Sequence, residues 1–218
     1  MKTSYLGAKS QVKRIPKRGH YDKETLCNIL DDGRICHVGF CIDGQPFVIP
    51  TLYGRKEDVI YIHGASTSRM LSNIDKGIPV CLTVTHVDAL VLARSGFHHS
   101  MNYRSAVIFG EAVKVPENEK IEILKVISDH IIPGRWEEVR APNKKELKAT
   151  TVMAIKIVQA SSKIRTGPPS DEKEDLELGI WAGLLPIVTS YGKPKPDEFV
   201  KNEKIPDSVI QALEYPNS

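Results

Sequence analysis

Three strand-like runs follow one another between residues 35 and 63, and short turns separate them. The first run, residues 35–42, alternates apolar side chains onto one face, and the Asp43-Gly44 pair after it is a strong hairpin signal. Residues 45–53 supply the return strand, and residues 59–63 supply a third strand. Consecutive strands joined by such turns predict an antiparallel meander.

The rest of the chain adds further strands and a few helices. The pattern predicts helices over residues 22–32, 66–76 and 117–132, and strands over residues 79–85, 89–93, 104–115 and 149–160. Helices and strands do not alternate strictly, which excludes a doubly wound parallel sheet. About six short antiparallel strands with intervening helices predict a mainly β fold, a small barrel.

The composition changes at both ends of this strand-rich region. Residues 1–20 are basic, and after residue 163 comes a Gly-Pro-Pro break followed by an acidic stretch and a segment rich in proline and lysine. We predict a basic N-terminal arm over residues 1–20, a barrel domain over 21–163 and a C-terminal extension over 164–218 that packs on the barrel. The arm is either solvated and partly ordered, or it contacts a phosphate or a partner.

Charge and hydropathy exclude several functional classes. A net charge of +3 over 218 residues is too mild for a dedicated nucleic-acid binder. The chain has no apolar run of the ~20 residues that a membrane helix needs, and its N-terminus lacks the apolar core of a secretory signal. The four cysteines form no C-x-x-C pair, so we expect reduced cysteines in a cytoplasmic protein without a metal site.

A phosphate site is indicated where the third strand meets the following helix. Gly64 is followed by Ser66, Thr67 and Ser68, and then by Arg69. A helix N-terminus offers unpaired N–H groups and a positive dipole end, and both favour an anion. The alternative is simple capping, with Arg69 in solvent. Capping accounts for one hydroxyl, whereas this junction carries three and an arginine.

Two other polar segments lie next to strands. Residues 97–105 (FHHSMNYRS) contain His98 and His99, which point to opposite sides of an extended chain and therefore do not readily share a metal. This segment is either a packed, hydrogen-bonded loop or a loop at a cofactor or substrate. Residues 161–165 (SSKIR) are either an exposed strand end or a further part of a site.

Several short segments occur together in a fixed order. They are VIPTLY at residues 48–53, IYIHGASTSR at 60–69, NYRS at 102–105, FGEA at 109–112, PGRW at 133–136, SSKIRTGP at 161–168 and WAG at 181–183. In this order and spacing they resemble the FMN-binding split barrels of the pyridoxamine 5′-phosphate oxidase-like superfamily, and in particular its nitroimidazole-resistance (Nim-like) branch.

The resemblance implies a fold, an assembly and a site. The fold is a six-stranded antiparallel split β-barrel, and the assembly is a homodimer with FMN at its interface. The implied cofactor-binding residues are Ile49, Pro50, Thr51, Leu52, His63, Gly64, Ser66, Ser68, Arg69, Tyr103, Arg104, Ser105, Lys163 and Trp181. The strand at residues 48–52 lines the flavin ring, largely through backbone groups, and Ser68 and Arg69 hold the phosphate. Residues 103–105 reach the flavin, in many members from the partner chain.

The resemblance also bears on the reaction. The substrate-binding arginine motif of true pyridoxamine oxidases has no match after Trp181, so we do not expect oxidation of pyridoxamine phosphate. We expect FMN and not FAD, because no glycine motif that cradles a pyrophosphate is present. The flavin carries the hydride chemistry, so no acid–base constellation is required and no catalytic residue is assigned.

Three functions remain open at this stage. The first is an FMN-dependent oxidoreductase that reduces a small electron-poor substrate, such as a nitroaromatic or a quinone. In it, His63, His98 and His99 are candidates for contacting the substrate or donating a proton. The second is a non-catalytic flavin-binding or flavin-sequestering protein. The third is a haem-binding member of the same fold, with a histidine as the axial ligand.

Overall fold

The computed structural model describes residues 4–201 and 204–214. Its strands are β1 (Gly19–His20), β2 (Ile35–Ile42), β3 (Gln45–Lys56), β4 (Val59–Ala65), β5 (Pro79–Leu92), β6 (Ser100–Lys114), β7 (Thr150–Lys156), β8 (Gln159–Arg165) and β9 (Gly183–Pro186). Its α-helices are α1 (Lys23–Asp32), α2 (Arg69–Ile74), α3 (Lys120–Ile131), α4 (Lys144–Ala149) and α5 (Asp207–Glu214). Short 3-10 helices are η1 (Pro16–Arg18), η2 (Gly96–His98), η3 (Arg135–Glu138) and η4 (Lys173–Glu177).

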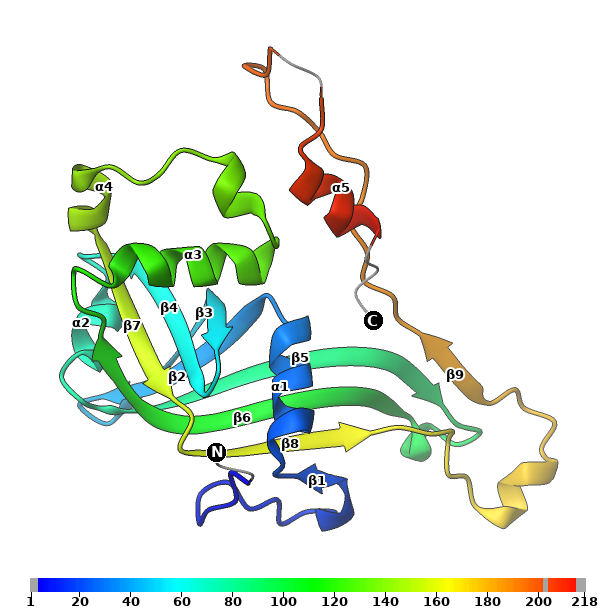
Figure 1. The fold of residues 1–218 in the computed structure, drawn as a ribbon. Helices are drawn as coiled ribbons and strands as arrows, with labels where there is room; N and C mark the ends of the chain where they lie inside the picture. Colours follow the sequence, from blue (N-terminus) through cyan, green and yellow to red (C-terminus); the bar gives the residue numbers. More distant parts are fainter. Residues whose placement is uncertain (1–3, 202–203, 215–218) are drawn as a thin grey trace. The chain divides into compact units, whose positions relative to one another are not determined.

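Within the described residues the strands form one antiparallel sheet of nine. Their order is β1-β8-β6-β7-β4-β3-β2-β5-β9, and β6 also pairs with β5 (Figure 1). That additional pairing closes a ring of six strands, β5, β2, β3, β4, β7 and β6. The predicted mainly β fold with a six-stranded split barrel is therefore confirmed.

The chain forms two compact units, which we describe separately. The first contains the described part of Met1–Gly33 together with Thr83–Ile108 and Val158–Val188. The second contains Arg34–Leu82, Phe109–Ile157 and the described part of Thr189–Ser218. The predicted division into arm, barrel domain and C-terminal extension stays a prediction. Residues 1–3 of the arm and 202–203 and 215–218 of the extension lie outside the described residues.

In the first unit, much of the N-terminal arm is packed. Tyr5 is buried, its N–H donates to Tyr21, and its carbonyl accepts from Ala160. β1 pairs with β8 in the register Gly19↔Lys163. Backbone pairing thus holds the described part of the arm at Tyr5 and at β1, while most of its side chains stay exposed.

Helix α1 of the same unit forms as its sequence predicts. Asp22 lies just before the helix and accepts a hydrogen bond from the Thr25 N–H at 2.8 Å, which satisfies one of the free N–H groups of the first turn. Leu26, Ile29 and Leu30 form the buried face. The helix stops before Gly33.

Three predicted strands are divided differently in the structure. The expected strands 79–85 and 89–93 form one continuous strand, β5. Asp88 lies within this strand, and its carboxylate accepts a hydrogen bond from Arg104. The expected strand 149–160 is divided into β7 and β8. Both lie beside β6, and the second neighbour is β4 for β7 and β1 for β8.

In the second unit, α3 lies across β3, β4 and β7 (Figure 1). Its residues Ile123 and Ile127 are buried against Val115 and Val152. Gly54 on β3 permits the close approach of the helix: a Cβ at this position would lie 2.7 Å from the Ile127 Cα. The glycine therefore sets the distance between α3 and the strand beneath it.

Candidate functional site

The second unit contains an opening between two neighbouring strands. β3 and β4 pair from Lys56↔Val59 to Tyr53↔Ile62. The next residue on each strand is Leu52 on β3 and His63 on β4, and both line a pocket beyond the last pair. The pocket therefore begins where the barrel strands separate.

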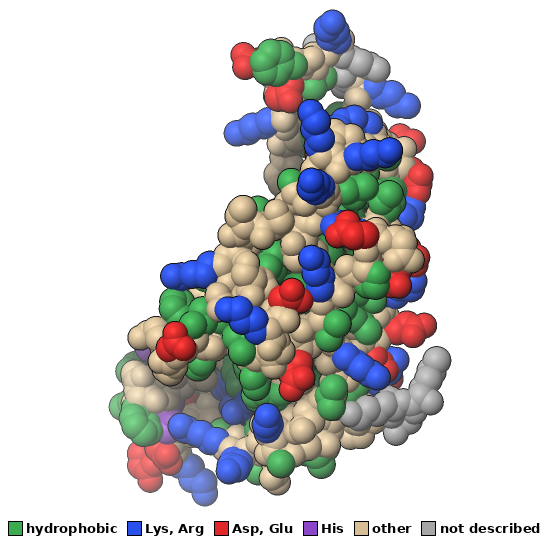
Figure 2. All heavy atoms as spheres, turned by 90° about the vertical axis from the view of Figure 1, so that its left-hand side faces the viewer, with side chains coloured by type: hydrophobic (Ala, Val, Ile, Leu, Met, Phe, Trp, Pro, Cys, Tyr) green, Lys and Arg blue, Asp and Glu red, His purple; other side chains and the backbone are tan. Residues whose placement is uncertain are grey.

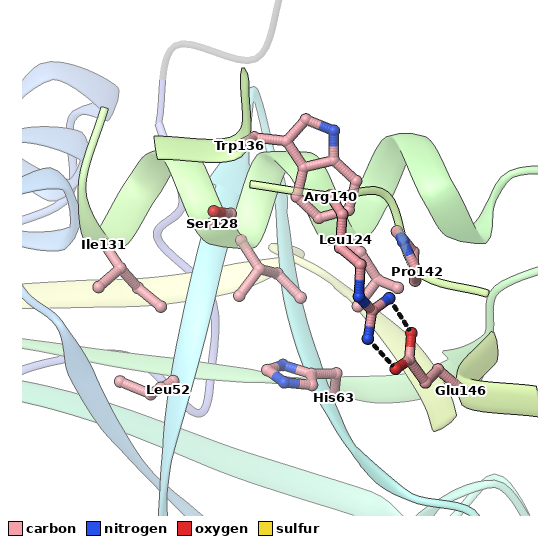
Figure 3. Close-up of a pocket in the computed structure, with 10 residues that line it drawn as sticks. Leu52, His63, Leu124, Ser128, Ile131, Trp136, Arg140, Pro142 and Glu146 are labelled. Atoms are coloured by element: carbon pink, nitrogen blue, oxygen red, sulfur yellow. Dashed lines mark hydrogen bonds and ion pairs between the residues drawn. The ribbon is translucent and has the colours of Figure 1, made fainter. Parts of the chain in front are cut away.

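This pocket has a volume of about 530 Å³, within the usual range for sites that hold a cofactor or a small ligand. Helix α3 and the segment after it form the opposite wall. The lining residues are Leu52, His63, Leu124, Ile127, Ser128, Ile131, Trp136, Arg140, Pro142 and Glu146. Figure 3 shows the His63 ring between Leu52 and the Arg140–Glu146 pair, with Leu124 and Trp136 on the far side of the pocket.

His63 is the titratable group best placed to act inside this pocket. The side chain is half-buried, and burial lowers the pKa of its imidazole. Its Nδ1 is buried and has no hydrogen-bond partner among the described residues. A neutral imidazole can bind a metal ion or exchange a proton through a ring nitrogen that the pocket reaches.

The polar side of the pocket is an ion pair. Arg140 donates from Nη1 to the Glu146 Oε2 at 2.8 Å and from Nη2 to the Oε1 at 2.5 Å. Glu146 also accepts from the Asn143 N–H, which makes it part of the capping box that begins α4. The Arg140 guanidinium, together with the Asn143 N–H, lowers the pKa of the Glu146 carboxyl to about 2.

Most of residues 49–52, the strand predicted to line the flavin ring, lie outside the lining of this pocket. Ile49, Pro50 and Thr51 lie on β3, where Pro50 pairs with His37 of β2. In the described chain β4 pairs with β3 only from Tyr53 onward, so this stretch has one edge that β4 does not cover. Leu52 alone of these residues lines the pocket.

The predicted phosphate junction differs from its expected form. α2 begins at Arg69 and has six residues, so Gly64 and Ser66 precede the helix. The Ser68 hydroxyl caps it by accepting from the Leu71 N–H at 3.4 Å. The Arg69 guanidinium lies 4.7 Å from the centre of the Phe47 ring. Phosphate binding here stays a prediction.

The other predicted site residues lie in the first unit. Arg104 donates to both Asp88 oxygens at 3.1 and 3.3 Å and to Asp32 at 2.6 Å, so its guanidinium joins β6 to β5 and to the end of α1. Tyr103 precedes it on β6 and is half-buried. In this unit Arg104 has a structural role that sequence reasoning did not anticipate.

The remaining predicted residues of this unit have local contacts. Ser105 donates to the Lys163 carbonyl at 3.3 Å, and Lys163 lies on β8. Trp181 is 67% exposed, and its ring lies beside Gly183. Their cofactor contacts stay predictions.

The two adjacent histidines of the first unit are held by their own chain. His99 Nε2 lies 3.2 Å from the Ala93 carbonyl, and His98 Nε2 lies 3.6 Å from a Glu172 oxygen. Of the two interpretations, these contacts favour the packed, hydrogen-bonded loop. Among the described residues no group of three or more histidines, cysteines or carboxylates is arranged to hold a metal ion.

Sequence reasoning missed most of the pocket wall. Trp136 belongs to the PGRW segment that carried part of the family resemblance, so that segment could have placed it at the site. Arg140 and Glu146 had one usable signal, the Asn143-x-x-Glu146 capping box that predicts the start of a helix. Leu124 and Ile131 were predicted only as the apolar face of α3.

Comparisons with known proteins assign the chain to a family. The pyridoxamine 5′-phosphate oxidase family matches residues 22–164, about two thirds of the chain. The chain belongs to this family. No curated protein matches it.

In the described residues, no helix has both the length and the apolar character to cross a membrane.

Solved structures show what this family member is similar to. The flavocytochrome Anf3 from Azotobacter vinelandii is 38% identical; the match covers 94% of this chain and 97% of that chain, with a TM-score of 0.88. An FAD and heme binding protein from Mycobacterium smegmatis is 36% identical, with 90% and 97% covered and a TM-score of 0.87.

A more distant structure shares the fold. A Bacteroides thetaiotaomicron protein named for 5-nitroimidazole antibiotic resistance is 21% identical, with 66% of this chain and 84% of that chain covered and a TM-score of 0.57. This similarity to the nitroimidazole-resistance branch concerns the fold alone. Together the comparisons support a flavin as cofactor.

Proposed function

We propose that the protein is an oxidoreductase that binds a flavin and a haem, with His63 as the haem ligand. The observation that carries the proposal is His63 itself, a half-buried imidazole with an unpartnered nitrogen in a pocket with mainly apolar walls. Two relatives support it, since one is named a flavocytochrome and the other an FAD and heme binding protein.

The pocket residues fit a haem. Histidine is a common axial ligand of haem iron, and the lowered pKa keeps the His63 imidazole neutral, the form in which nitrogen binds a metal. Leu52, Leu124 and Ile131 present apolar side chains to a flat apolar macrocycle. Trp136 adds an aromatic surface to the same wall and helps to exclude water from the imidazole.

A bound haem would supply one-electron chemistry, and a flavin accepts or donates one or two electrons. The chain itself would contribute the axial nitrogen and the apolar walls. We propose that these residues would hold the haem, and that electrons from a reductant such as NAD(P)H would pass to a small electron-poor acceptor.

For the flavin, the β3 edge that β4 does not cover supports the implied role of residues 49–52. Backbone N–H and C=O groups of such an edge can pair with the donors and acceptors of a flavin ring. The relative that is named for FAD favours FAD over the FMN expected from the sequence. α2 also weakens the argument for FMN, because it is short and Ser68 is engaged in its cap. The mass of the released flavin decides between the two.

We also propose that the protein is a homodimer. In the second unit, Ile35 and Val48 are exposed apolar residues on the same face of the paired strands β2 and β3, with 51% and 63% exposure. A surface of this kind is typical of a protein interface. Light scattering at micromolar concentration is expected to give twice the mass of one chain, and the mass of one chain would contradict the proposal.

A second function remains, a flavin enzyme without haem that reduces a nitroaromatic or quinone. The same apolar pocket, with Trp136 in its wall, favours it because a small aromatic substrate would stack there. In that case His63 would contact the substrate or donate a proton to it.

The experiment that separates the two functions is reconstitution of the full chain with haem and flavin. For the flavohaem protein we expect a Soret band whose position changes in His63→Ala, while the flavin content stays the same. A chain that takes up flavin but no haem, and that oxidises NAD(P)H with a nitroaromatic or quinone acceptor, would support the second function. A chain that binds flavin, takes up no haem and does not oxidise NAD(P)H would be a flavin-sequestering protein.

A further inference from the structure

Among the described residues that line the pocket, the charged pair is Arg140 and Glu146. Every other lining side chain is apolar or neutral, including the His63 imidazole. A guanidinium is a strong binding group for carboxylates and phosphates, because it donates two parallel hydrogen bonds to them. In this structure the carboxylate that it holds is one of the chain's own.

The pair is open to exchange with a ligand. The two side chains are 70% and 43% exposed, so water screens their attraction, and an acidic ligand can reach the guanidinium. Arg140 also lies between η3 and α4, in a segment without regular structure.

Glu146 does not depend on Arg140 for its position. Its Oε2 accepts from the Asn143 N–H at 2.8 Å, and its own N–H donates to the Asn143 side chain at 3.0 Å. Its carbonyl accepts from the Thr150 hydroxyl. The carboxylate can therefore lose the guanidinium and remain the N3 residue of the α4 capping box.

We propose that Arg140 exchanges Glu146 for an acidic group of the molecule that fills the pocket. The ligand class is a flat, largely apolar body that carries a carboxylate or a phosphate. The inference rests on the proposed function, since the haem proposed for this pocket carries carboxylates; a flavin nucleotide in its place would present a phosphate. In this proposal Arg140 selects the ligand by its acidic group. The Glu146 carboxylate competes with that group for the Arg140 guanidinium.

The test compares ligand pairs that differ only in the acidic group. The full chain, freed of bound pigment, is titrated with haem and with haem dimethyl ester, and separately with FMN and with riboflavin. The variants are Arg140→Gln and Glu146→Gln. Glutamine is accepted at the N3 position of a capping box, so α4 keeps its start. Arg135→Gln is the matched control, because Arg135 is paired with Glu138 and does not line the pocket.

We expect Arg140→Gln to weaken binding of one acidic ligand about 10-fold, equivalent to ~1.4 kcal/mol. Binding of its uncharged counterpart is expected to stay unchanged. Glu146→Gln is expected to strengthen binding of the acidic ligand, and Arg135→Gln to leave all four unchanged. The haem pair responds if the group is a carboxylate, and the FMN pair if it is a phosphate.

Equal effects of Arg140→Gln on the acidic and the uncharged member of both pairs would overturn the inference. If haem still bound through His63 in that case, the proposed function would survive without it. If the wild-type chain bound neither haem nor flavin, both would be wrong.

Discussion

Gly54→Ala tests how closely α3 approaches the sheet beneath the pocket. A Cβ at residue 54 would lie 2.7 Å from the Ile127 Cα, 2.9 Å from its N and 3.0 Å from the Val126 carbonyl oxygen. All three are backbone atoms of α3, so no side chain can rotate away to make room. To reach an ordinary contact distance of 3.4 Å, the helix and the strand must separate by at least ~0.7 Å.

The expected cost follows from overpacking. Forcing backbone to shift in a packed core costs about 1–3 kcal/mol. For a chain of this length, ~2 kcal/mol corresponds to a melting temperature lower by about 4–8 °C. Because Leu124, Ile127 and Ile131 move with the helix, haem or flavin that contacts them is expected to bind more weakly.

Thermal unfolding followed by circular dichroism provides the measurement. Gly96→Ala is the control, because a Cβ at residue 96 meets nothing within 4 Å and its φ is not positive. We expect the control to melt within ~1 °C of wild type. Equal melting temperatures for Gly54→Ala and the control would refute the role given to this close approach.

Three further changes test other contacts. In the wild type, the unfolded chain gains a proton on His63 below pH ~6.5 that the buried imidazole resists, so stability falls as the pH falls. His63→Gln is therefore expected to make the free energy of unfolding fall less steeply between about pH 7.5 and 5.5. Equal slopes in chemical denaturation would contradict this. Ser208→Ala removes a hydroxyl at the start of α5 that donates to Glu138. We expect faster proteolysis at residues 204–214 with little change in melting temperature. Unchanged cleavage would count against the contact. Arg104→Gln leaves the Asp88 carboxylate without its guanidinium and is expected to cost about 1–2 kcal/mol, seen as a melting temperature lower by roughly 2–8 °C. A melting temperature equal to wild type would show that the ion pairs contribute nothing.

Local signals explain which parts of the fold could be predicted. The bounds of α1 followed from Asp22 and Gly33, and those of β2 from its alternation and the Asp43-Gly44 turn. The bounds of β5, β7 and β8 depend on which strands they pair with, and that information lies far away in the sequence. The strand-like segment at residues 149–160 does not reveal that one of its neighbours changes from β4 to β1 at residues 157–158.

The candidate site was also predictable from the sequence only in part. Leu52 and His63 were found because they lie in motifs of the family resemblance. The opposite wall, with Trp136 and the Arg140–Glu146 pair, is brought there by the packing of α3 on β3. Charge alone also gave little guidance, since Lys/Arg and Asp/Glu are interspersed on the face drawn in Figure 2.

The most direct test of the central claim is the absorption spectrum of the full chain as purified, with identification of the pigments that it releases. We predict a Soret band together with flavin absorption, and a His63→Ala variant that loses or shifts the Soret band while it retains flavin. A wild-type spectrum without haem after growth with ample haem supply, or a Soret band identical in His63→Ala, would contradict the assignment of His63 and its pocket to haem.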